Sequence, residues 1–166
     1  MSLDSERFRE IFGSFPTAVA IVTALDEQGR PRGFTCNAVC SVSAATPRLL
    51  VGVGKSSQTF PALAASGAFV VNFLAESGEQ ASRTFADKGP DKFAGLVWEP
   101  SAHAGGAPIL TDIALAYAEC RTVQTVDAGD HWLLIADVHG GETYSREPLL
   151  YCRGAYSTWP APAGRH

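Results

Sequence analysis

The stretch from Gly33 to Phe60, GFTCNAVCSVSAATPRLLVGVGKSSQTF, holds the patterns that decide the fold. Residues 33–43 alternate between two sides, as in a β-strand. One side is apolar and suits a core, with Phe34, Cys36, Ala38 and Cys40. The other side carries Thr35, Asn37, Val39 and Ser41, which is unusual for a strand in a buried setting. We expect the groups at 35–38 to meet the edge of a flat heterocycle, although a half-exposed strand shows the same pattern.

The second half of this stretch combines a short apolar strand, 49–53, with the run Lys55-Ser56-Ser57-Gln58-Thr59. Ser56 or Ser57 can cap a helix that continues to about Ala65 and is ended by Gly67. A helix N-terminus favours an anion, because its free N–H groups and its dipole both act there. The run therefore predicts a site for a phosphate or pyrophosphate, although an ordinary helix cap uses the same residues.

Local patterns place the remaining elements. A helix begins at Asp4 or Ser5 and ends before Pro16, with an apolar side formed by Phe8, Ile11, Phe12 and Phe15. Strands are expected at 18–25 and 68–74, and a capping box at Ser77–Gln80 opens a helix to about Ala86. Two longer strands, 113–126 and 131–138, flank the turn DAGD, and a last strand covers 149–156.

These elements amount to about six strands with two or three helices, which predicts a mainly β fold built as a closed or partly closed antiparallel barrel. Residues 87–112 are rich in Gly, Pro and Ala and are expected to be irregular. We assign 1–160 to one domain and 161–166 to a frayed C-terminal tail.

Composition restricts the function. The chain has 166 residues, of which 18% are charged, and its net charge is −4. The sequence has no basic run that would favour nucleic acid, and no apolar run reaches the ~18 residues of a membrane span. Its polar, amphipathic start differs from a signal peptide, so we expect a cytoplasmic protein. In that reducing compartment Cys36, Cys40, Cys120 and Cys152 should be free thiols, and their spacing predicts no metal site.

Several common motifs are absent. The segment GVGKSS at 52–57 is not a P-loop, because that motif requires Gly at position 49, where Leu49 stands. The chain also has no GxGxxG after a strand, no GxSxG and no histidine–glutamate pair with zinc-protease spacing.

Two further clusters are candidates for a site. Gly129-Asp130-His131 leads from a turn into a strand, where a histidine at a pocket rim is neutral or charged near neutral pH. The alternative interpretation of this segment is a surface hairpin in which the histidine has no functional role. On the second helix Arg83, close to Phe85, offers a cation to a phosphate, and a solvated arginine is the alternative.

Taken in order, these pieces resemble the short-chain flavin reductases, the small reductase components of two-component flavin-dependent monooxygenases. Single motifs are degenerate, but their order, ending in GDH and RGAY, is specific. The matching segments are FREIFGSFPTAVAIVT (8–23), the stretch 33–60 quoted above, FVVNFLAESGEQASRTFA (69–86), KFAG (92–95), APILTDIALAYAECR (107–121), GDHWLLIADV (129–138) and PLLYCRGAY (148–156).

The resemblance implies an FMN-binding split barrel, a Greek-key antiparallel barrel that works as a homodimer. It maps the flavin ring onto Thr35, Cys36, Asn37 and Ala38, with Cys36 as a small apolar wall. It maps the ribityl and phosphate contacts onto Lys55, Ser56, Ser57 and Thr59, with Arg83 and Phe85 on the following helix. It maps the nicotinamide nucleotide onto Gly129, Asp130, His131 and Tyr156. Many relatives have two prolines where this chain has Ala45-Thr46-Pro47-Arg48, outside the proposed site.

The function implied is an NAD(P)H:flavin oxidoreductase that passes hydride from NADH to FAD or FMN and supplies diffusible reduced flavin to a partner monooxygenase. No acid or base of the protein is essential, because the cofactors carry the chemistry. FAD needs more room beyond the phosphate than FMN does, and no residue of the sequence decides between the two flavins. The lack of an arginine cluster in 88–106 favours NADH over NADPH. The alternatives are a non-catalytic flavin- or haem-binding split barrel, an oxidase of the pyridoxamine-phosphate type and a plain interaction domain.

Overall fold

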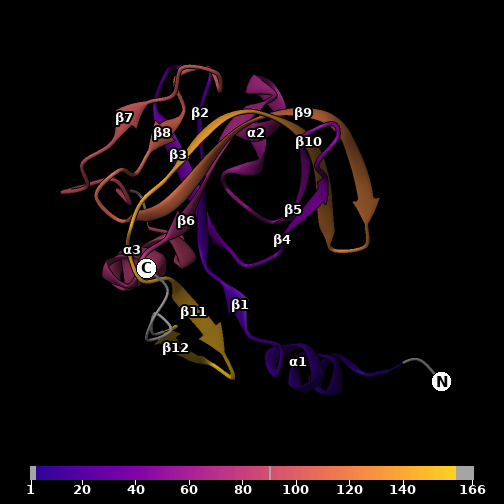
Figure 1. Ribbon diagram of the computed structural model, residues 1–166. Helices are drawn as coiled ribbons and strands as arrows, with labels where there is room; N and C mark the ends of the chain where they lie inside the picture. The colour runs from indigo at the N-terminus through magenta and orange to yellow at the C-terminus, as the bar shows by residue number, and fades with distance from the viewer. Residues whose placement is uncertain (1–2, 90, 160–166) are drawn as a thin grey trace.

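The computed structural model describes residues 3–89 and 91–159, and its centre is a seven-stranded sheet (Figure 1). The strand order is β3-β2-β6-β9-β10-β5-β4, and all neighbours are antiparallel. The strands are β2 (Ala20–Leu25), β3 (Pro31–Cys36), β4 (Val39–Ser43), β5 (Arg48–Gly54), β6 (Ala68–Leu74), β9 (Ala114–Ala128) and β10 (His131–Thr143). The predicted tail, 161–166, lies outside the described residues.

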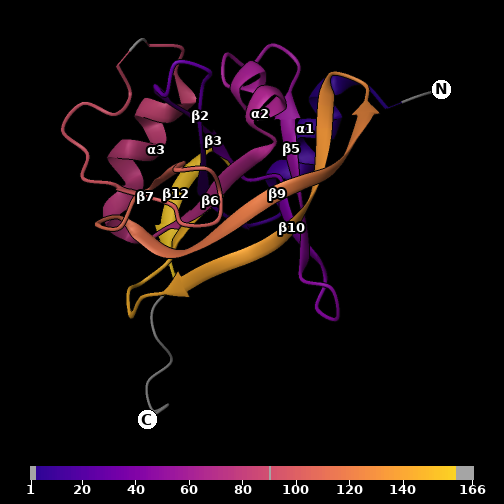
Figure 2. The same cartoon turned by 90° about the horizontal axis from the view of Figure 1, so that it is seen from above.

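The two edge strands of this sheet, β3 and β4, are consecutive in sequence and are joined only by Asn37 and Ala38. Such a link spans at most about 11 Å between the Cα atoms of residues 36 and 39, so the two edges must lie close together. The backbone N–H of Gly52 in β5 donates to the carbonyl of Ala38 at 2.8 Å. The sheet is therefore curled into a barrel, which can be followed in Figures 1 and 2.

The prediction of one strand over 33–43 is wrong. Strand β3 pairs with β2, whereas β4 pairs with β5, so the chain changes partners at 37–38. The alternation of burial breaks at the same point, because Cys36 is buried while Ala38 and Cys40 are exposed. The sequence pattern cannot distinguish one continuous strand from two strands that pair with different neighbours. The backbone is extended in both cases, so the side chains alternate in the same way.

Among the described residues apolar side chains form three clusters. One lies inside the barrel, one lies beneath α3 (Glu79–Ala86), and a smaller one joins β6 to the segment 104–109. Adjacent residues of β2 belong to different clusters: Val22 faces the barrel interior and Ile21 faces the second cluster. Both faces of this strand are thus buried, which explains why its sequence is a continuous apolar run. The barrel cluster includes Val51, Val53, Phe69, Val71 and Leu134, and the second includes Leu74, Phe85, Leu110 and Leu149.

Two further α-helices, α1 (Ser5–Gly13) and α2 (Phe60–Ser66), and the 3₁₀ turn η1 (Glu76–Gly78) precede α3 in the described chain. Asp4 caps α1 as predicted, because its carboxylate accepts a hydrogen bond from the backbone N–H of Arg7 at 2.8 Å. The predicted capping box is wrong. Ser77 lies inside η1, and Gly78 precedes α3 without a side-chain hydrogen bond.

Short strands complete the fold. β1 (Thr17–Ala18), β11 (Leu149–Cys152) and β12 (Ala155–Thr158) form a second sheet, and β7 (Glu99–Pro100) pairs with β8 (Pro108–Ile109). The single strand predicted over 149–156 is a hairpin, whose turn residues Arg153 and Gly154 both have positive φ. Strand β10 continues beyond its predicted end at 138. Its Gly141 allows close approach to β9, where a Cβ would collide with the carbonyl oxygen of Tyr117.

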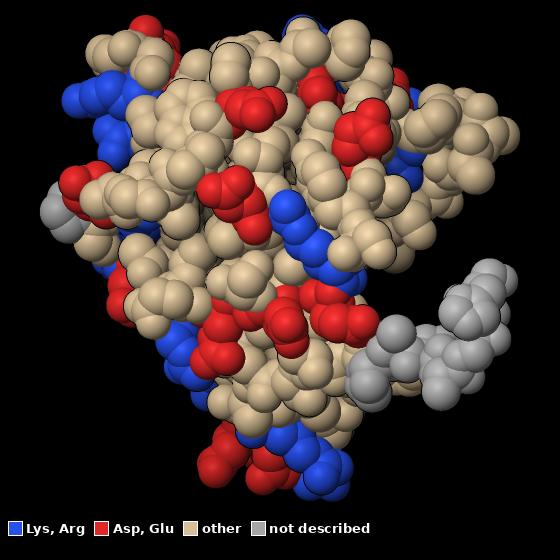
Figure 3. Space-filling view, turned by 60° about the vertical axis from the view of Figure 1, so that its left-hand side comes forward, with Lys and Arg blue, Asp and Glu red and all other residues tan. Residues whose placement is uncertain are grey.

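Charged groups of both signs are distributed over the surface. On the face seen in Figure 3, acidic and basic side chains lie next to one another. Arg48 pairs with Asp137 at 2.7 Å, and Asp26 pairs with both Arg30 and Arg32, at 2.9 and 3.0 Å. In the ranges given above, no helix has the length and apolar character required to cross a membrane.

Asn72 of β6 is a fully buried polar side chain that connects three parts of the fold. Its amide nitrogen donates to the Thr23 hydroxyl at 3.2 Å and to the Pro108 carbonyl at 3.3 Å. Its amide oxygen accepts from the backbone N–H of Leu110 at 2.8 Å. Asn72 thereby fixes the irregular segment around β8 to the sheet.

Replacement of this side chain is expected to destabilise the protein. Asn72→Leu leaves the Leu110 N–H without its acceptor, so the free energy of unfolding should fall by about 2–3 kcal/mol. Exposed Gln124 of β9 provides the control, since Gln124→Leu should change it by no more than about 0.5 kcal/mol. Urea denaturation of both variants measures the effect, and an unchanged Asn72→Leu protein would contradict the assigned role.

Candidate functional site

A polar hollow of about 180 Å³ lies where the end of β3, the loop after β5 and the end of α3 meet. The loop contributes Ser56, Ser57 and Thr59, and β3 contributes Thr35. On the opposite side the lining comes from Phe85 of α3 and from Asp87, Lys88 and Lys92 in the segment that follows it. The sequence therefore places hydroxyl groups and ammonium groups around one space.

The loop that carries the hydroxyl groups is held by its own backbone and by the β9–β10 turn. Lys55 N–H donates to the Asp130 carbonyl at 2.9 Å, and Ser57 N–H donates to the Gly54 carbonyl at 2.9 Å. The Ser57 hydroxyl accepts from Thr59 N–H at 3.2 Å. The predicted helix cap at Ser56 or Ser57 is wrong, because α2 begins at Phe60, after Thr59. With only seven residues, α2 does not supply the helix-dipole site expected from the sequence.

The cations that line the hollow differ from those expected. Lys55 pairs with Asp127 at 2.7 Å and lies over the Trp132 ring, so it is directed toward the β9–β10 hairpin. Arg83 pairs with Glu79 at 2.8 Å and lies over the Tyr156 ring, outside this hollow. Sequence reasoning did not name Lys88 or Lys92 as site residues. Lys92 begins the KFAG segment of the resemblance, but both lysines lie in a region expected to be irregular.

Lys92 is positioned by backbone acceptors at the wall of the hollow. Its Nζ donates to the Phe85 carbonyl at 3.0 Å and to the Gly33 carbonyl at 3.4 Å. Partial burial lowers the pKa of Lys92, and nearby Asp87 partly opposes this effect. Gly33 is required here because a Cβ would lie 2.7 Å from the Phe85 ring. Phe85 itself is buried and meets Phe93 edge to face, with ring centroids 4.9 Å apart.

The structure separates the four residues predicted to surround a flat ring. Thr35 lines the hollow, and its hydroxyl donates to the Ser82 carbonyl at 2.6 Å. Cys36 is 5% exposed and points into the barrel, where its thiol donates to the Gly52 carbonyl at 3.4 Å. Asn37 lines a different hollow beside Phe15, and Ala38 is exposed. The Cys36 thiol thus faces the barrel interior, and its nearness to a flavin ring stays a prediction.

The Gly129-Asp130-His131 turn stands at the rim of the polar hollow. Gly129 has positive φ, which suits the two-residue turn between β9 and β10. His131 Nδ1 lies 2.7 Å from the Asp130 carboxylate, and this hydrogen bond lowers the pKa of Asp130. A Cβ on Gly54, a lining residue, would lie 3.8 Å from His131 Nε2. His131 is exposed and available to a ligand entering from this side.

The contacts of Tyr156 lie away from His131. Its hydroxyl lies 2.8 Å from the Ser82 hydroxyl, and Ser82 in turn accepts the hydrogen bond of Thr35 through its carbonyl. Tyr156 also lines a separate hollow with Glu76 and Glu79. The structure thus connects Tyr156 with the β3 side of the site, away from the turn with which it was grouped.

The structure is thus a curled antiparallel barrel with a hollow at its rim that hydroxyl groups, two lysines and one aspartate line. The profile of the family described as "Flavin reductase like domain" matches residues 12–160. The chain belongs to this family, so the resemblance found in the sequence is confirmed.

Individual relatives agree with this assignment. The chain is 42% identical to the flavin reductase (NADH) of Kitasatospora aureofaciens, over 95% of this chain and 83% of that protein. It is 38% identical to HsaB of Rhodococcus jostii, the reductase subunit of a flavin-dependent monooxygenase, over 97% and 84% of the two chains. Among solved structures, the Streptomyces globisporus NADH:FAD oxidoreductase SgcE6, in complex with NAD and FAD fragments, superposes with a TM-score of 0.89. That chain is 31% identical, and the match covers 99% of this chain and 100% of that one.

The buried position of Cys36 leads to a prediction about thiol reactivity. Burial raises the pKa of Cys36 to about 11 and that of Cys120 to about 12, so at about pH 8 both should remain protonated and unreactive. A thiol reagent should label exposed Cys40 in the native protein but reach Cys36 and Cys120 only after unfolding. Cys40→Ser should remove one native reactive thiol, whereas Cys36→Ser should remove none. Rapid native labelling of Cys36 would contradict its placement.

Proposed function

We propose that this protein is an NAD(P)H:flavin oxidoreductase that reduces FAD or FMN and supplies diffusible reduced flavin to a partner monooxygenase. The observation that carries the proposal is the hollow of about 180 Å³, lined by hydroxyl and ammonium groups and with the His131 turn at its rim, in a chain of the flavin reductase-like family. When bound, the nicotinamide supplies a hydride from C4 to N5 of the flavin. The contribution of the protein is to bind and orient the two partners.

The lining of the hollow fits the phosphate and ribityl chain of a flavin. Hydroxyl groups at Ser56, Ser57 and Thr59 can donate hydrogen bonds, and the ammonium groups of Lys88 and Lys92 provide positive charge. Thr35 of β3 and Phe85 of α3 also line the hollow. Asp87 also lines the hollow, and the two ammonium groups outnumber its carboxylate. The residues present therefore suit a phosphorylated polyol, with Lys88 and Lys92 in the place expected for Lys55 and Arg83.

His131 is proposed to hold the nicotinamide nucleotide. The Asp130 carboxylate fixes the imidazole through Nδ1, so Nε2 faces the rim beside Gly54. From there the imidazole could form a hydrogen bond with a polar group of a bound nicotinamide nucleotide. NADH is the proposed donor, as in the name of the Kitasatospora relative. We propose the cytoplasm as the site of action, where the four unpaired cysteines stay reduced.

The alternatives have less support. A non-catalytic flavin- or haem-binding barrel would leave the His131 turn without a role, and the named relatives are reductases. The HsaB relative is the reductase subunit of a monooxygenase, which supports transfer of reduced flavin to an oxygenase. An oxidase of the pyridoxamine-phosphate type or a plain interaction domain has no observation in its favour among the described residues.

The proposed activity is tested by the loss of NADH absorbance with flavin-free protein and added FMN, FAD or riboflavin. Turnover should require flavin and saturate with it. His131→Ala should raise the KM for NADH about tenfold, the effect of one lost hydrogen bond to a charged group, with little change in kcat. Exposed His139→Ala is the control and should behave as wild type. Flavin binding without NADH consumption would refute the reductase proposal and favour a binding protein.

We also propose a homodimer formed through α1. Among described residues this helix has no buried side chain, and Phe8, Ile11, Phe12 and Phe15 are 48–66% exposed. The Phe8 and Phe12 rings lie 4.4 Å apart on one side, and α1 extends away from the sheet in Figure 1. A short amphipathic helix depends on tertiary packing for stability, so this side requires a cover. A second copy of the chain is the proposed cover.

Light scattering coupled to size-exclusion chromatography tests the dimer. Wild type should elute with twice the chain mass, and the double variant Phe8→Ser, Phe12→Ser should elute as a monomer. The matched variant Arg9→Ser, exposed on the same helix, should remain a dimer. A monomeric wild type at micromolar concentration would refute the proposal.

A further inference from the structure

In the described part of the chain, Lys55 stands between two residues that line the polar hollow but does not line it itself. Its neighbours Gly54 and Ser56 both belong to the lining. The Nζ of Lys55 donates instead to both oxygens of the Asp127 carboxylate, at 2.8 and 2.7 Å, and lies 4.6 Å from the centre of the Trp132 ring. The ammonium group is therefore engaged with the β9–β10 hairpin, and the proposed phosphate contacts leave it without a role.

Lys55 is joined to the turn of this hairpin at two points. Its backbone N–H donates to the carbonyl of Asp130 at 2.9 Å, and its Nζ binds the side chain of Asp127. Asp127 in turn accepts a hydrogen bond from the backbone N–H of Gly129 at 3.2 Å. Lys55 thus contacts, directly or through Asp127, the residues that lead the chain into His131.

The ammonium group of Lys55 and the imidazole of His131 lie on opposite faces of the hairpin. Trp132 and Asp127 are partners in the β9–β10 register, so their side chains share a face, and Lys55 Nζ contacts both. His131 precedes Trp132 in β10, and its side chain points to the other face, where a Cβ at Gly54 would lie 3.8 Å from Nε2. Any effect of Lys55 on a ligand of His131 must therefore pass through the position of the turn.

The ring of Trp132 connects this contact to the body of the fold. It stacks on Phe60, the first residue of α2, with ring centroids 5.6 Å apart and planes inclined by 12°. An ammonium group near the indole ring gains a cation–π interaction. The hydrogen bond from Lys55 lowers the pKa of Asp127, so this carboxylate stays ionised at neutral pH. The ion pair is thus held against an aromatic ring that is itself packed on α2.

We propose that Lys55 is a positioning residue for the nicotinamide nucleotide: it fixes the turn that carries His131 to the loop that carries Ser56 and Ser57, and it does not bind the flavin phosphate. The inference rests on the proposed function, because it takes the nucleotide to bind at His131 and the flavin phosphate to bind at the loop. Since one residue joins the loop to the turn, the spacing between the two ligands depends on it.

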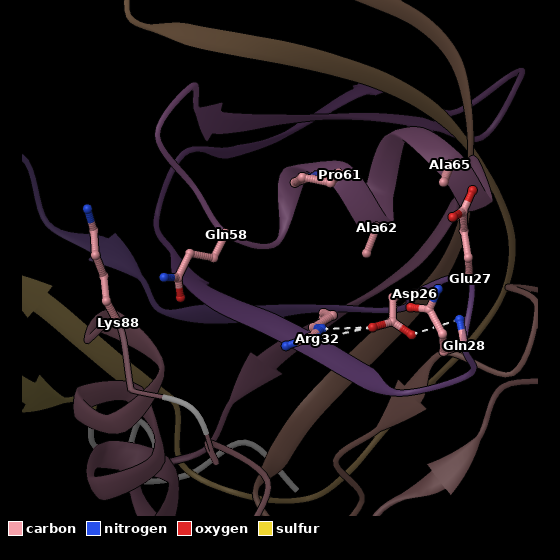
Figure 4. Close-up of a pocket in the computed structure, with 9 residues that line it drawn as sticks. All are labelled: Asp26, Glu27, Gln28, Arg32, Gln58, Pro61, Ala62, Ala65 and Lys88. Carbon is pink, nitrogen blue, oxygen red and sulfur yellow. Dashed lines mark hydrogen bonds and ion pairs between the residues drawn. The ribbon is translucent and has the colours of Figure 1, made fainter.

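Lys88 offers a comparison, because its placement is the opposite of that of Lys55. It follows α3, is exposed, and lines both the polar hollow and the larger hollow between α2 and β3 that is drawn in Figure 4. Its ammonium group is the one proposed above for the flavin phosphate. The two lysines should therefore affect different ligands, Lys55 the nucleotide and Lys88 the flavin.

Steady-state kinetics and flavin titration of two variants test the assignment. Lys55→Met should raise the KM for NADH about fivefold, the upper range for an exposed ion pair, with little change in kcat and an unchanged Kd for FMN. Lys88→Met should show the reverse pattern. Its Kd for FMN should rise about fivefold, its Kd for riboflavin, which has no phosphate, should stay unchanged, and its KM for NADH at saturating FMN should match wild type.

Two further variants control for the loss of an ion pair and for the loss of charge. Arg48 joins β5 to β10 through Asp137 at 2.7 Å, and its side chain is 35% exposed, as is that of Lys55. Arg48→Met removes a comparable pair at the other end of these strands, so both the KM for NADH and the Kd for FMN should match wild type. Lys55→Arg keeps the charge and can stack on Trp132, so it should restore the KM of wild type.

Double variants separate positioning from a general weakening of the protein. If Lys55 acts through His131, Lys55→Met should raise the KM for NADH no further once His131→Ala is present, whereas independent effects would multiply. Asp127→Asn keeps an acceptor for the Gly129 N–H but removes the ion pair. It should reproduce the effect of Lys55→Met, and the two changes together should have no larger effect than either one alone.

The outcomes distinguish this inference from the proposed function. If Lys55→Met weakened the binding of FMN but not of riboflavin, Lys55 would be a phosphate ligand and the inference would be overturned. It would also be overturned if Lys55→Met left the KM for NADH unchanged while His131→Ala raised it, or if the two effects multiplied; flavin reduction would remain intact in each of these cases. If His131→Ala left the KM unchanged, or if wild type reduced no flavin, the proposed function would fail, and the inference with it.

Discussion

The two-residue link between β3 and β4 is the constraint on which the rest of the molecule depends. Because Asn37 and Ala38 join strands at opposite edges of one sheet, the sheet has to curl until those edges meet. Closure places the end of β3 beside the loop after β5, which is how Thr35 comes to share a hollow with Ser56 and Ser57. The polar residues at 35 and 37 thus mark the place where pairing changes, and Thr35 also lines the hollow of the candidate site.

Features set by nearby residues could be predicted from the sequence, and features set by distant partners could not. The Asp4 cap and the turn between β9 and β10 depend on a few consecutive residues, and both were predicted. The exchange of partners at 37–38 depends on β2 and β5, which an alternating pattern does not show. The start of α2 was misplaced for a related reason, because Ser57 bonds to Thr59 N–H in a loop of its own before the helix begins.

The candidate site was predicted in part, and the cations that line its hollow, Lys88 and Lys92, are not the ones expected from the sequence. The resemblance pointed to the loop Ser56–Thr59 and to His131, which lie together at the hollow and its rim, although their roles stay predictions. The cations could not be assigned from sequence, because a positive side chain is directed by its ion-pair partner. Lys55 has Asp127 across the hairpin, whereas Lys92 reaches the hollow through carbonyl groups that only the fold brings near.

This distribution of ion pairs also bears on how tightly a flavin is held. Exposed pairs such as Lys55 with Asp127 and Arg83 with Glu79 contribute at most about 1 kcal/mol to stability, but they withdraw two cations from the phosphate. Lys88 remains as an exposed cation, and the pKa of Lys92 is lowered by burial. A phosphate bound mainly by hydroxyl groups and a solvated ammonium is held with moderate strength, since water competes for the same contacts. Moderate affinity suits a protein that takes up oxidised flavin and releases it reduced, whereas a permanent prosthetic group would call for buried, paired charges.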